Sequence, residues 1–321
     1  MAEKPDSVRD VVIVGGGAAG LSAALTLARA RRRVTVVDAG APRNAPAEGV
    51  HGLLALDGVS PGELLRRGRA EVTGYGGEIL AGEVVEVAST MEGFAATLRD
   101  GRVLRARRLL IATGLIDELP EIPGLRERWG RDLIHCPYCH GWEVRDQLIG
   151  VLATGPMSVH QALLFRQWSD RVLLLAGTHE FGAEDLAKLE AFGVPVIAGR
   201  VSRVEIDEDE DRLTGVRLDD GRVVEVEVLA VAPRMVARAE VFAGIGITAT
   251  EHPMGSFIAA DPTGSTTVAG VWAAGNSADL AAQVSAAAAD GARAGAHINA
   301  VLLFEDVDRA VARLADATAS R

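Results

Sequence analysis

Short apolar runs alternate with helical patterns along most of the chain. The runs at residues 11–14 and 34–37 are apolar throughout, as in strands buried on both faces of a parallel sheet. A third strand is predicted at residues 108–114, and two more at 148–152 and 172–175 enclose another stretch of helical character. Strands that alternate with helices in this way predict an α/β fold with two Rossmann-like, doubly wound domains.

The composition allows two domains and argues against several classes of partner. The chain has 321 residues, of which 48% are apolar, enough for two sizeable cores. Its 33 basic and 44 acidic side chains give a net charge of −11, which disfavours nucleic acid and anionic membranes as partners. The least polar long stretch, residues 280–296, still contains Asp290 and Arg293, so no transmembrane span is expected.

The N-terminal residues and the cysteine content bear on location. Residues 1–10 are polar and lead directly into the first strand, unlike a secretory signal, so we expect a cytoplasmic protein. Cys136 and Cys139 are the 2 cysteines of the chain. In a reducing compartment such a pair is more often catalytic or metal-binding than structural.

A glycine-rich loop joins the first predicted strand to the first predicted helix. Gly15, Gly17 and Gly20 have G-x-G-x-x-G spacing, and the second strand ends at Asp38. Gly15 permits the tight turn, Gly17 allows a pyrophosphate to approach the backbone, and Gly20 lets the helix pack closely on the strand. Asp38 can accept hydrogen bonds from a ribose diol. We therefore predict a dinucleotide site that comprises Gly15, Gly17, Ala18, Ala19, Gly20, Asp38 and Ala39.

Two later stretches identify the dinucleotide by resemblance. Residues 108–114 end in Ala-Thr-Gly, and residues 270–298 read as a strand, a glycine turn and a long Ala-rich helix. Together with the glycine loop, they resemble the flavoprotein disulfide reductase superfamily, and within it the small thioredoxin reductases. The resemblance implies FAD as cofactor. It also implies an FAD-binding domain formed by residues 1–117 and 234–321, with a smaller central α/β domain, 118–233, inserted into it.

The same resemblance assigns further residues to the flavin. Asn276 would lie near the ribityl or phosphate groups, where family members usually carry Asp, and Gln283 and Val284 would lie near the isoalloxazine. The resemblance also implies a loop around the flavin and a backbone contact to adenine. Four residues are assigned to these roles, with an ordinary surface loop or strand as the alternative: Arg43, Asn44, His51 and Val84. The remaining residues assigned to the site are Ala112, Thr113, Gly114 and Gly275.

The central domain carries a degraded version of a second glycine loop. In thioredoxin reductases this unit binds NADPH, but here the three glycine or alanine positions are Ala153, Gly155 and Ser158, and Pro156 removes an N–H donor. Residues 176–180 follow the next strand without Arg or Lys, and they include a glutamate that would repel a 2′-phosphate. We expect NADPH binding to be lost or very weak, with an unusual surviving site as the alternative.

The sequence HCPYCHGW at residues 135–142 offers four interpretations. The first is haem attachment through C-x-x-C-H, which requires export and does not suit a chain without a secretory signal. The second is a zinc site, but His135, Cys136, Cys139 and His140 lie too close together in sequence to surround one tetrahedral zinc ion. An inert turn is the third interpretation. The fourth, which we favour, is a redox disulfide beside the flavin, because two cysteines in C-x-x-C spacing can form a bridge across one helical turn. A helix that starts here would lower the pKa of the Cys136 thiol.

The histidine after the second cysteine departs from the usual reductase pattern. Thioredoxin reductases carry an Asp acid where this chain has His140. An imidazole with an ordinary pKa of about 6.5 accepts a thiol proton at neutral pH better than a carboxylate of pKa about 4. The pattern C-P-x-C-H-G resembles the dithiol oxidases of the gliotoxin and holomycin pathways. A structural hydrogen bond is the alternative role for His140 and for His135.

This resemblance implies a FAD-dependent dithiol oxidase that uses O2 and releases H2O2. Cys139 would be the sulfur close to the flavin, Cys136 the one that exchanges with substrate, and His140 the base. The substrate would be a small-molecule dithiol or disulfide or a thioredoxin-like protein, and the chain would form a homodimer. A reductase driven by NAD(P)H or ferredoxin and a non-catalytic flavin-binding redox sensor are the alternatives.

Overall fold

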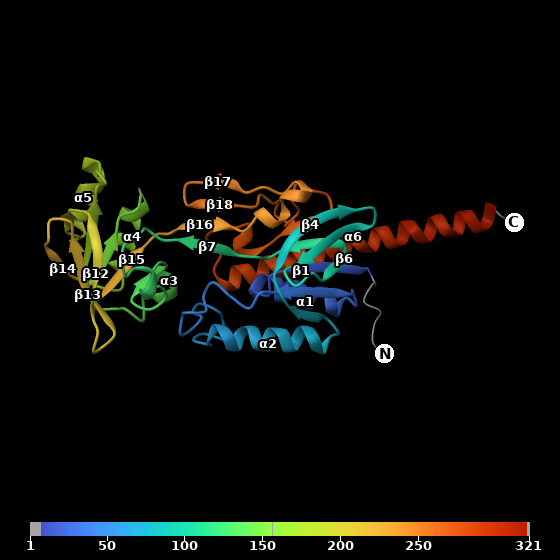
Figure 1. Cartoon of the computed structure of the whole chain (residues 1–321), viewed down its shortest axis with the longest axis horizontal. Helices are drawn as coiled ribbons and strands as arrows, with labels where there is room; N and C mark the ends of the chain where they lie inside the picture. The colour runs from blue at the N-terminus through green and yellow to red at the C-terminus, as the bar shows by residue number, and fades with distance from the viewer. Residues whose placement is uncertain (1–7, 156, 320–321) are drawn as a thin grey trace. The chain divides into compact units, whose positions relative to one another are not determined.

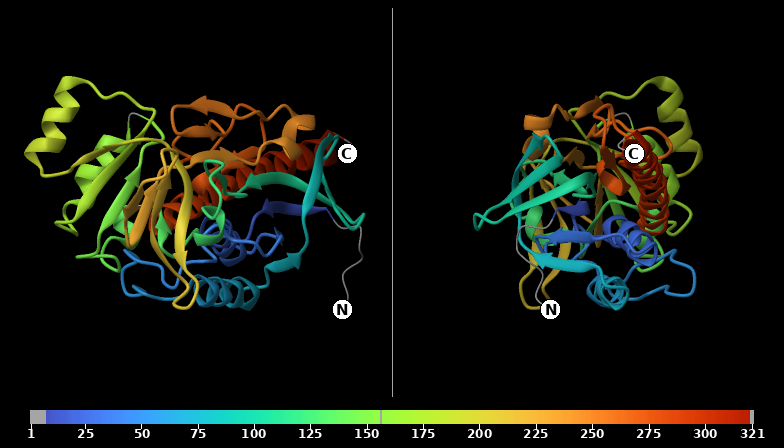
Figure 2. Two further views of the ribbon diagram at one scale, coloured as in Figure 1. Left: turned by 60° about the vertical axis from the view of Figure 1, so that its left-hand side comes forward. Right: turned by 90° about the vertical axis from the view of Figure 1, so that its right-hand side faces the viewer.

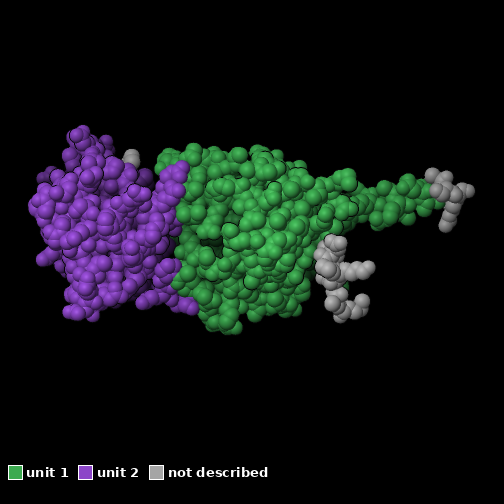
Figure 3. Space-filling model, viewed as in Figure 1, with its two compact units in different colours: residues 1–45, 61–116, 235–321 green, residues 46–60, 117–234 purple. Residues whose placement is uncertain are grey.

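The computed structural model describes residues 8–155 and 157–319. It divides into two compact units, coloured separately in Figure 3. Unit 1 comprises residues 1–45, 61–116 and 235–321, and unit 2 comprises residues 46–60 and 117–234. The assignment of residues 46–60 to unit 2 is a tertiary feature, because no break in the sequence pattern separates this loop from its neighbours.

Unit 1 is built on a seven-stranded sheet in which β3-β2-β1-β6-β5-β4 are consecutive and β19 pairs with β6. The strands are β1 (Arg9–Val14), β2 (Val34–Asp38), β3 (Glu78–Ala81), β4 (Val84–Thr90), β5 (Gly93–Leu98), β6 (Val103–Ile111) and β19 (Val271–Ala273). The members β3, β2, β1, β6 and β19 pair in parallel, whereas β5 pairs antiparallel with β4 and β6. The predicted strands at 11–14, 34–37 and 108–114 are therefore present as β1, β2 and β6.

Three α-helices complete this part of unit 1 (Figures 1 and 2). They are α1 (Ala18–Arg29), α2 (Pro61–Gly74) and α6 (Val284–Ala319). A four-stranded sheet, ordered β17-β18-β16-β7, and two 3-10 helices also occur. Their bounds are β7 (Leu115–Glu118), β16 (Arg234–Ala237), β17 (Thr250–His252), β18 (Gly255–Phe257), η2 (Glu240–Ile245) and η3 (Gly275–Ser277). The boundaries between the units fall within β7 and β16.

Unit 2 contains a parallel five-stranded sheet, ordered β11-β10-β9-β15-β8, and an antiparallel three-stranded sheet, β12-β13-β14. The strands are β8 (Leu133–Ile134), β9 (Ile149–Leu152), β10 (Val172–Gly177), β11 (Val196–Ala198), β12 (Val201–Asp207), β13 (Arg212–Leu218), β14 (Val223–Glu225) and β15 (Val228–Val231). The helices are α3 (Pro137–His140), α4 (Met157–Phe165), α5 (Ala183–Ala191) and the 3-10 helix η1 (Arg126–Arg128). Each unit thus contains a parallel sheet with helices, and the predicted α/β, Rossmann-like fold class is confirmed.

Glycines allow α6 to lie directly against the backbone of α1. A Cβ on Gly291 would lie 1.9 Å from the Ala19 carbonyl oxygen, and one on Gly295 would lie 2.9 Å from the Ala23 carbonyl oxygen. Ala23 itself is fully buried. Because contacts this short leave no room for a methyl group, the two helices pack at the closest distance that their backbones permit.

Partly buried ion pairs anchor the middle of α6 to the sheet. The Arg107 guanidinium of β6 is 12% exposed and lies 3.0 Å from Asp10, 3.0 Å from Glu305 and 2.7 Å from Asp306. Arg32 contacts Asp306 as well, at 2.6 Å. Beyond these anchors, α6 continues away from the sheet of unit 1 (Figure 1). Among the described residues, no helix is both long enough and apolar enough to cross a membrane.

We predict that Gly291→Ala destabilises unit 1 by about 1–3 kcal/mol, the usual cost of overpacking. The reason is that the added methyl group would meet a backbone carbonyl rather than a flexible side chain. Denaturant unfolding followed by circular dichroism measures the change. Gly62→Ala on α2 is the matched control, since no atom lies within 4 Å of its Cβ position. Equal unfolding midpoints for the two variants would contradict this account of helix packing.

Candidate functional site

The glycine loop of unit 1 has a different geometry at each of its three glycines. Gly15 has φ 113°, and a Cβ there would lie 2.1 Å from the Ala112 carbonyl oxygen. A Cβ on Gly20 would lie 1.9 Å from the Gly15 carbonyl oxygen. Gly17, the residue that caps α1, has no atom within 4 Å of its Cβ position. Two of the glycines therefore serve packing, and the third leaves open space at the N-terminus of a 12-residue helix, where backbone N–H groups favour phosphate.

Asp38 lies beside this loop and is oriented by two contacts. Its Oδ1 accepts a hydrogen bond from the Gly40 N–H at 3.0 Å, and its Oδ2 lies 2.6 Å from the Arg69 guanidinium of α2. A Cβ on Gly16 would lie 2.5 Å from the same Oδ2, so the carboxylate directly adjoins the loop. Sequence analysis did not identify Arg69, because the arginine lies on α2, 31 residues after Asp38. The neighbouring Ala39 is exposed.

Ser277 joins two segments, distant in sequence, that are predicted to bind the cofactor. Its side chain is fully buried, and its Oγ accepts a hydrogen bond from the Gly114 N–H at 3.0 Å and lies 3.4 Å from Thr113 Oγ1. Gly275, which precedes it in η3, has φ 65°. The end of β6 and the turn after β19 are therefore held together. Sequence analysis missed Ser277, although its position beside Asn276 was a signal that could have identified it.

The Asn276 side chain organises the turn that leads into α6. Its Nδ2 donates hydrogen bonds to the Asp279 carbonyl at 3.0 Å and to the Ala282 carbonyl at 2.9 Å. An aspartate, the residue that the family usually carries here, has no N–H to make these bonds. Gln283 and Val284 are half-buried where the helix begins, and the Gln283 carbonyl accepts the Ala287 N–H at 2.8 Å. Asn276 thus fixes the start of α6.

The four residues assigned to a loop and strand around the flavin do not all fall in unit 1. Arg43 and Asn44 belong to unit 1 and are half-buried. Val84 begins β4, is 5% exposed, and pairs with Leu98. His51 belongs instead to unit 2, the unit that also holds the two cysteines. The structure therefore brings together the glycine loop, Asp38 and the residues near 114 and 276, whereas it groups His51 with the cysteine segment.

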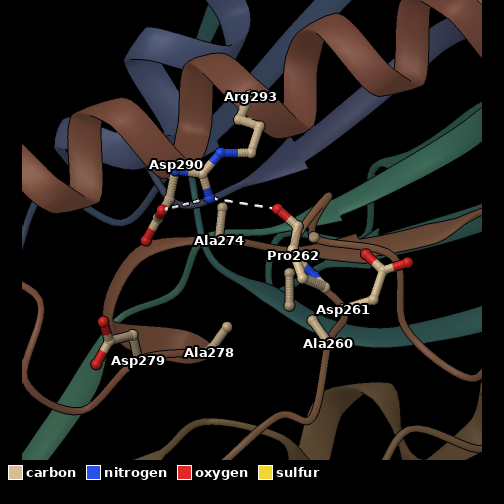
Figure 4. A pocket seen from close by; sticks show the side chains of 10 residues that line it. Ala260, Asp261, Pro262, Ala274, Ala278, Asp279, Asp290 and Arg293 are labelled. Carbon is tan, nitrogen blue, oxygen red and sulfur yellow. Dashed lines mark hydrogen bonds and ion pairs between the residues drawn. The ribbon is translucent and has the colours of Figure 1, made fainter.

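A second feature of unit 1 is a small polar pocket of about 200 Å³ beside the turn after β19 (Figure 4). Ala274 and Ala278 contribute to its wall. Arg293 donates hydrogen bonds to Asp290 at 3.0 Å and to the Pro262 carbonyl at 3.3 Å. The charged lining residues are Asp261, Asp279, Asp290 and Arg293. Three carboxylates against one guanidinium disfavour a pyrophosphate here, which leaves the glycine loop as the better phosphate site.

The two cysteines of unit 2 flank a single helical turn. Cys136 is the residue before α3, and the Cys139 N–H donates to the Cys136 carbonyl at 3.2 Å. Both side chains are half-buried. The predicted helix is present, but it contains only 4 residues, so its dipole is weaker than that of a long helix. This arrangement keeps both sulfurs on one short, partly accessible segment.

Packing behind this turn holds it in place. A Cβ on Gly141 would lie 2.7 Å from the Trp168 ring and 2.5 Å from the Pro137 carbonyl oxygen. The Tyr138 ring meets the same Trp168 edge to face, with 5.8 Å between ring centroids. Gly141 is therefore required for the indole to approach the turn that carries the cysteines.

His135 and His140 have different environments. The Val231 carbonyl lies 3.1 Å from His135 Nδ1, and because a carbonyl can only accept, Nδ1 is the nitrogen that donates. This bond favours the structural role that was the alternative for His135. Burial lowers the pKa of His140 below 6.5, while the Glu143 carboxylate opposes that shift and His51 adds to it. His140 is therefore neutral at pH 7 and can accept a proton.

The degraded second glycine loop has its amide groups occupied. Ser158 Oγ accepts hydrogen bonds from the Thr154 N–H at 3.0 Å and the Gly155 N–H at 3.3 Å, and the side chain is 1% exposed. These are the backbone donors that a phosphate would need. Ala153 is buried at the end of β9, and Pro156 lies outside the described residues. The serine hydroxyl thus satisfies two backbone donors of the predicted second glycine loop.

The neighbouring strand end carries exposed, uncharged or acidic residues. After β10 ends at Gly177, residues 178–180 are exposed and include Glu180. The cation Arg200 follows Gly199, the residue that forms an isolated bridge with Gly177. Its side chain is 72% exposed and lies 3.9 Å from Asp219. Within the described part of the chain, no group of three or more His, Cys, Asp or Glu side chains forms a cluster that could hold a metal ion.

Comparison with known proteins shows similarity in both sequence and fold. Residues 9–291 match the family described as pyridine nucleotide-disulphide oxidoreductase. Thioredoxin reductase tcpT of Claviceps purpurea is 32% identical, over 93% of this chain and 96% of that protein, and thioredoxin reductase sirT of Leptosphaeria maculans is 30% identical, over 94% and 96%. The crystal structure of HlmI superposes with a TM-score of 0.91 at 48% identity, covering 98% of both chains. An oxidoreductase from Agrobacterium tumefaciens superposes with a TM-score of 0.87 at 39% identity, covering 93% of this chain and 99% of the other.

We predict that Gly17→Val folds but contains no flavin, whereas Gly20→Val is destabilised. The valine at position 17 has room in the protein and would fill only the space left for the pyrophosphate, while the valine at position 20 would meet the Gly15 carbonyl. Visible flavin absorbance relative to protein absorbance measures occupancy, and thermal unfolding measures stability. A fully flavin-loaded Gly17→Val protein would show that the phosphates bind elsewhere.

Proposed function

Because the chain belongs to the pyridine nucleotide-disulphide oxidoreductase family, we propose that this thioredoxin reductase-like oxidoreductase is a FAD-dependent dithiol oxidase. Members of the family are flavin-dependent. The substrate is a molecule with two thiols that leaves as its disulfide. The single observation that carries the proposal is the second glycine loop, whose amide donors are hydrogen-bonded to Ser158 instead of being available to a nicotinamide nucleotide.

The residues of unit 1 fit FAD. The open space at Gly17 lies at a helix N-terminus, and the Asp38 carboxylate adjoins it with one oxygen directed to Gly40 and the other to Arg69. The Gly15–Gly20 loop would hold the pyrophosphate, Asp38 the ribose, and the segment tied by Ser277 the rest of the cofactor. When bound, FAD would supply the acceptor for two electrons. O2 would be the final acceptor and would be reduced to H2O2.

The thiol chemistry belongs to the cysteine segment of unit 2. A substrate thiolate attacks Cys136 Sγ of the oxidised pair, forms a mixed disulfide, and breaks the Cys136–Cys139 bond, so that Cys139 leaves as a thiolate. The second substrate thiol then attacks the substrate sulfur that is bonded to Cys136. The substrate leaves as its disulfide, and Cys136 is released as a thiolate. One substrate dithiol becomes a disulfide, and the enzyme disulfide becomes a dithiol, so that two electrons and two protons pass to the enzyme.

His140 is the proposed base for this exchange. It follows Cys139 directly, and burial lowers its pKa, so it is neutral and able to take a substrate thiol proton at pH 7. An aspartate at this position would already be ionised and would be a much weaker base. His135 is assigned a positioning role, since its ring donates to the Val231 carbonyl and its own carbonyl accepts from Gln161 at 2.8 Å.

Two further functions remain as alternatives. A reductase that uses NAD(P)H or ferredoxin is favoured by the relatives named as thioredoxin reductases and by Arg200, which follows the residue that bridges to the end of β10. That cation lies 3.9 Å from Asp219. A flavin-binding redox sensor without turnover would share both sites. The substrate class, a small dithiol or a thioredoxin-like protein, is part of the proposal.

A homodimer is also part of the proposal. The outer part of α6 carries apolar side chains at positions 304, 307, 311 and 314, which repeat at alternating intervals of three and four. Phe304, Val307, Val311 and Leu314 are 68%, 48%, 60% and 70% exposed. Such spacing gives a helix one apolar stripe, of the kind that pairs with another helix. This exposed stripe supports self-association.

We predict that a small dithiol, but not NADPH or NADH, bleaches the flavin when it is mixed with the oxidised protein without oxygen. The Ser158 hydroxyl competes with a nucleotide phosphate for the Thr154 and Gly155 amides, and the strand end lacks the cations that a 2′-phosphate needs. Losing two charge-assisted contacts of about 1.5–3 kcal/mol each weakens binding by a hundredfold or more. Stopped-flow absorbance measures bleaching, and readmitted oxygen should restore the colour with release of peroxide. Rapid, saturable bleaching by micromolar NADPH or NADH would support the reductase instead.

We predict that Cys136→Ser and Cys139→Ser each abolish dithiol turnover while the protein keeps its flavin. His140→Gln should slow turnover by roughly 10²–10⁴-fold at pH 7, the range for losing a positioned base. Because substrate thiols ionise without help at high pH, the deficit of His140→Gln should shrink as the pH rises toward about 9. Oxygen consumption with a dithiol, measured across this pH range, provides the test. A pH-independent deficit would assign His140 to structure rather than to proton transfer.

A further inference from the structure

Acids and imidazoles alternate along a series of contacts in unit 2 that leads from Asp57 through His51 to Glu143, close to His140. Glu143 follows His140 by three residues, and its Oε1 lies 3.4 Å from His51 Nε2. The other ring nitrogen of His51, Nδ1, lies 3.4 Å from Asp57 Oδ2. The order is Asp57, His51, Glu143 and then His140. Two of these residues come from the 46–60 loop and two from the segment that carries the cysteines.

The loop that presents His51 is held by its own backbone. Val50 and Val59 form an antiparallel bridge, with the Val50 N–H donating to the Val59 carbonyl at 2.8 Å. The Asp57 carboxylate accepts the Gly52 N–H at 2.9 Å. A Cβ on Gly49 would lie 3.0 Å from His51 Nε2, so the glycine leaves room for the ring. The His51 side chain is only 25% exposed, and its position is therefore defined by the fold.

We propose that Glu143, held in place by His51, is a positioning residue for His140, whose protonated form its carboxylate stabilises after a thiol proton has been taken up. This inference rests on the proposed function, because it gives His140 the proton of the substrate thiol. A half-buried imidazolium is unfavourable without a nearby negative charge. The Glu143 carboxylate supplies that charge. The Glu143 side chain is 40% exposed, and its contact with His51 keeps the carboxylate from turning toward solvent.

The electrostatic balance at His140 supports this assignment. Burial is the largest influence and lowers the pKa of His140, Glu143 raises it, and a positive charge on His51 lowers it. Of the other groups close to His140, Cys136 and Cys139 lie on its own segment. The neighbouring helix α4 carries one titratable side chain, His160, which is exposed. Glu143 is thus the group that offsets the burial of His140.

The test is the titration of His140 in the flavin-loaded protein, followed by NMR of ¹⁵N-labelled imidazoles and assigned by loss of the signal in His140→Gln. In Glu143→Gln, burial acts without its offset, so the midpoint of His140 should fall by roughly half a pH unit or more. The matched controls are Glu190→Gln, an exposed acid on α5, and His160→Gln on α4. Both should leave the midpoint unchanged. An unchanged midpoint in Glu143→Gln overturns the proposal.

The part played by His51 needs a double-mutant cycle. His51→Gln removes a repulsive charge whether or not Glu143 is present, and that direct effect cancels between the two arms of the cycle. If His51 acts by holding Glu143, its removal has an additional effect that lowers the His140 midpoint only when Glu143 is present. The midpoint after His51→Gln should therefore shift further toward low pH in the wild-type background than in the Glu143→Gln background. Equal changes in both backgrounds would overturn the role of His51.

This experiment also separates the inference from the proposed function. The titration reports on His140 whether or not the protein oxidises a dithiol, so absence of turnover with the predicted shifts would overturn only the oxidase. Turnover without the shifts would overturn only the positioning role. As a second readout, the pH dependence of iodoacetamide alkylation of the reduced cysteines should change in Glu143→Gln and stay unchanged in Glu190→Gln.

Discussion

Direct contact between backbones through glycine is the constraint on which unit 1 depends. The α1 helix meets the preceding loop at Gly20, and it meets α6 at Gly291, in both cases with a carbonyl oxygen where a Cβ would otherwise be. Side chains at these positions would push the helix away from the sheet and from α6. The short contacts at Gly20 and Gly291 therefore hold the N-terminus of α1, with its open space at Gly17, at the end of β1.

The turn that precedes α6 is positioned by the same packing. Since α6 is fixed against α1 and is anchored by Arg107, the turn before it can be held by Asn276, and Ser277 can reach the Gly114 amide. Asn276 therefore has a structural role: an amide can donate to two carbonyls of the turn, and a carboxylate cannot. Residues that are predicted to bind the cofactor lie far apart in sequence and are brought together by helix packing rather than by local signals.

Unit 2 combines a parallel sheet with a strand-to-helix turn whose backbone donors are hydrogen-bonded within the chain. This is the β9–α4 turn, and its amides are satisfied internally by Ser158. The cysteine segment of the same unit is held firmly by Trp168 against Gly141 and by Gln161 against His135. The segment proposed for thiol exchange is thus held by packing and hydrogen bonds, while two amides of the β9–α4 turn are hydrogen-bonded to the Ser158 side chain.

The sequence by itself determined the fold class, the glycine loop and the cysteine pair. These features depend on neighbouring residues: continuous apolar runs define buried parallel strands, and the spacing of Gly15, Gly17 and Gly20 defines the turn between strand and helix. Only the tertiary structure decided the contacts of side chains from distant segments. Arg69 beside Asp38, Ser277 beside Gly114, and His51 beside Glu143 each join elements separated by many residues. No local pattern encodes such pairs, because their distance is set by how helices, strands and loops pack and not by the order of the residues in the chain.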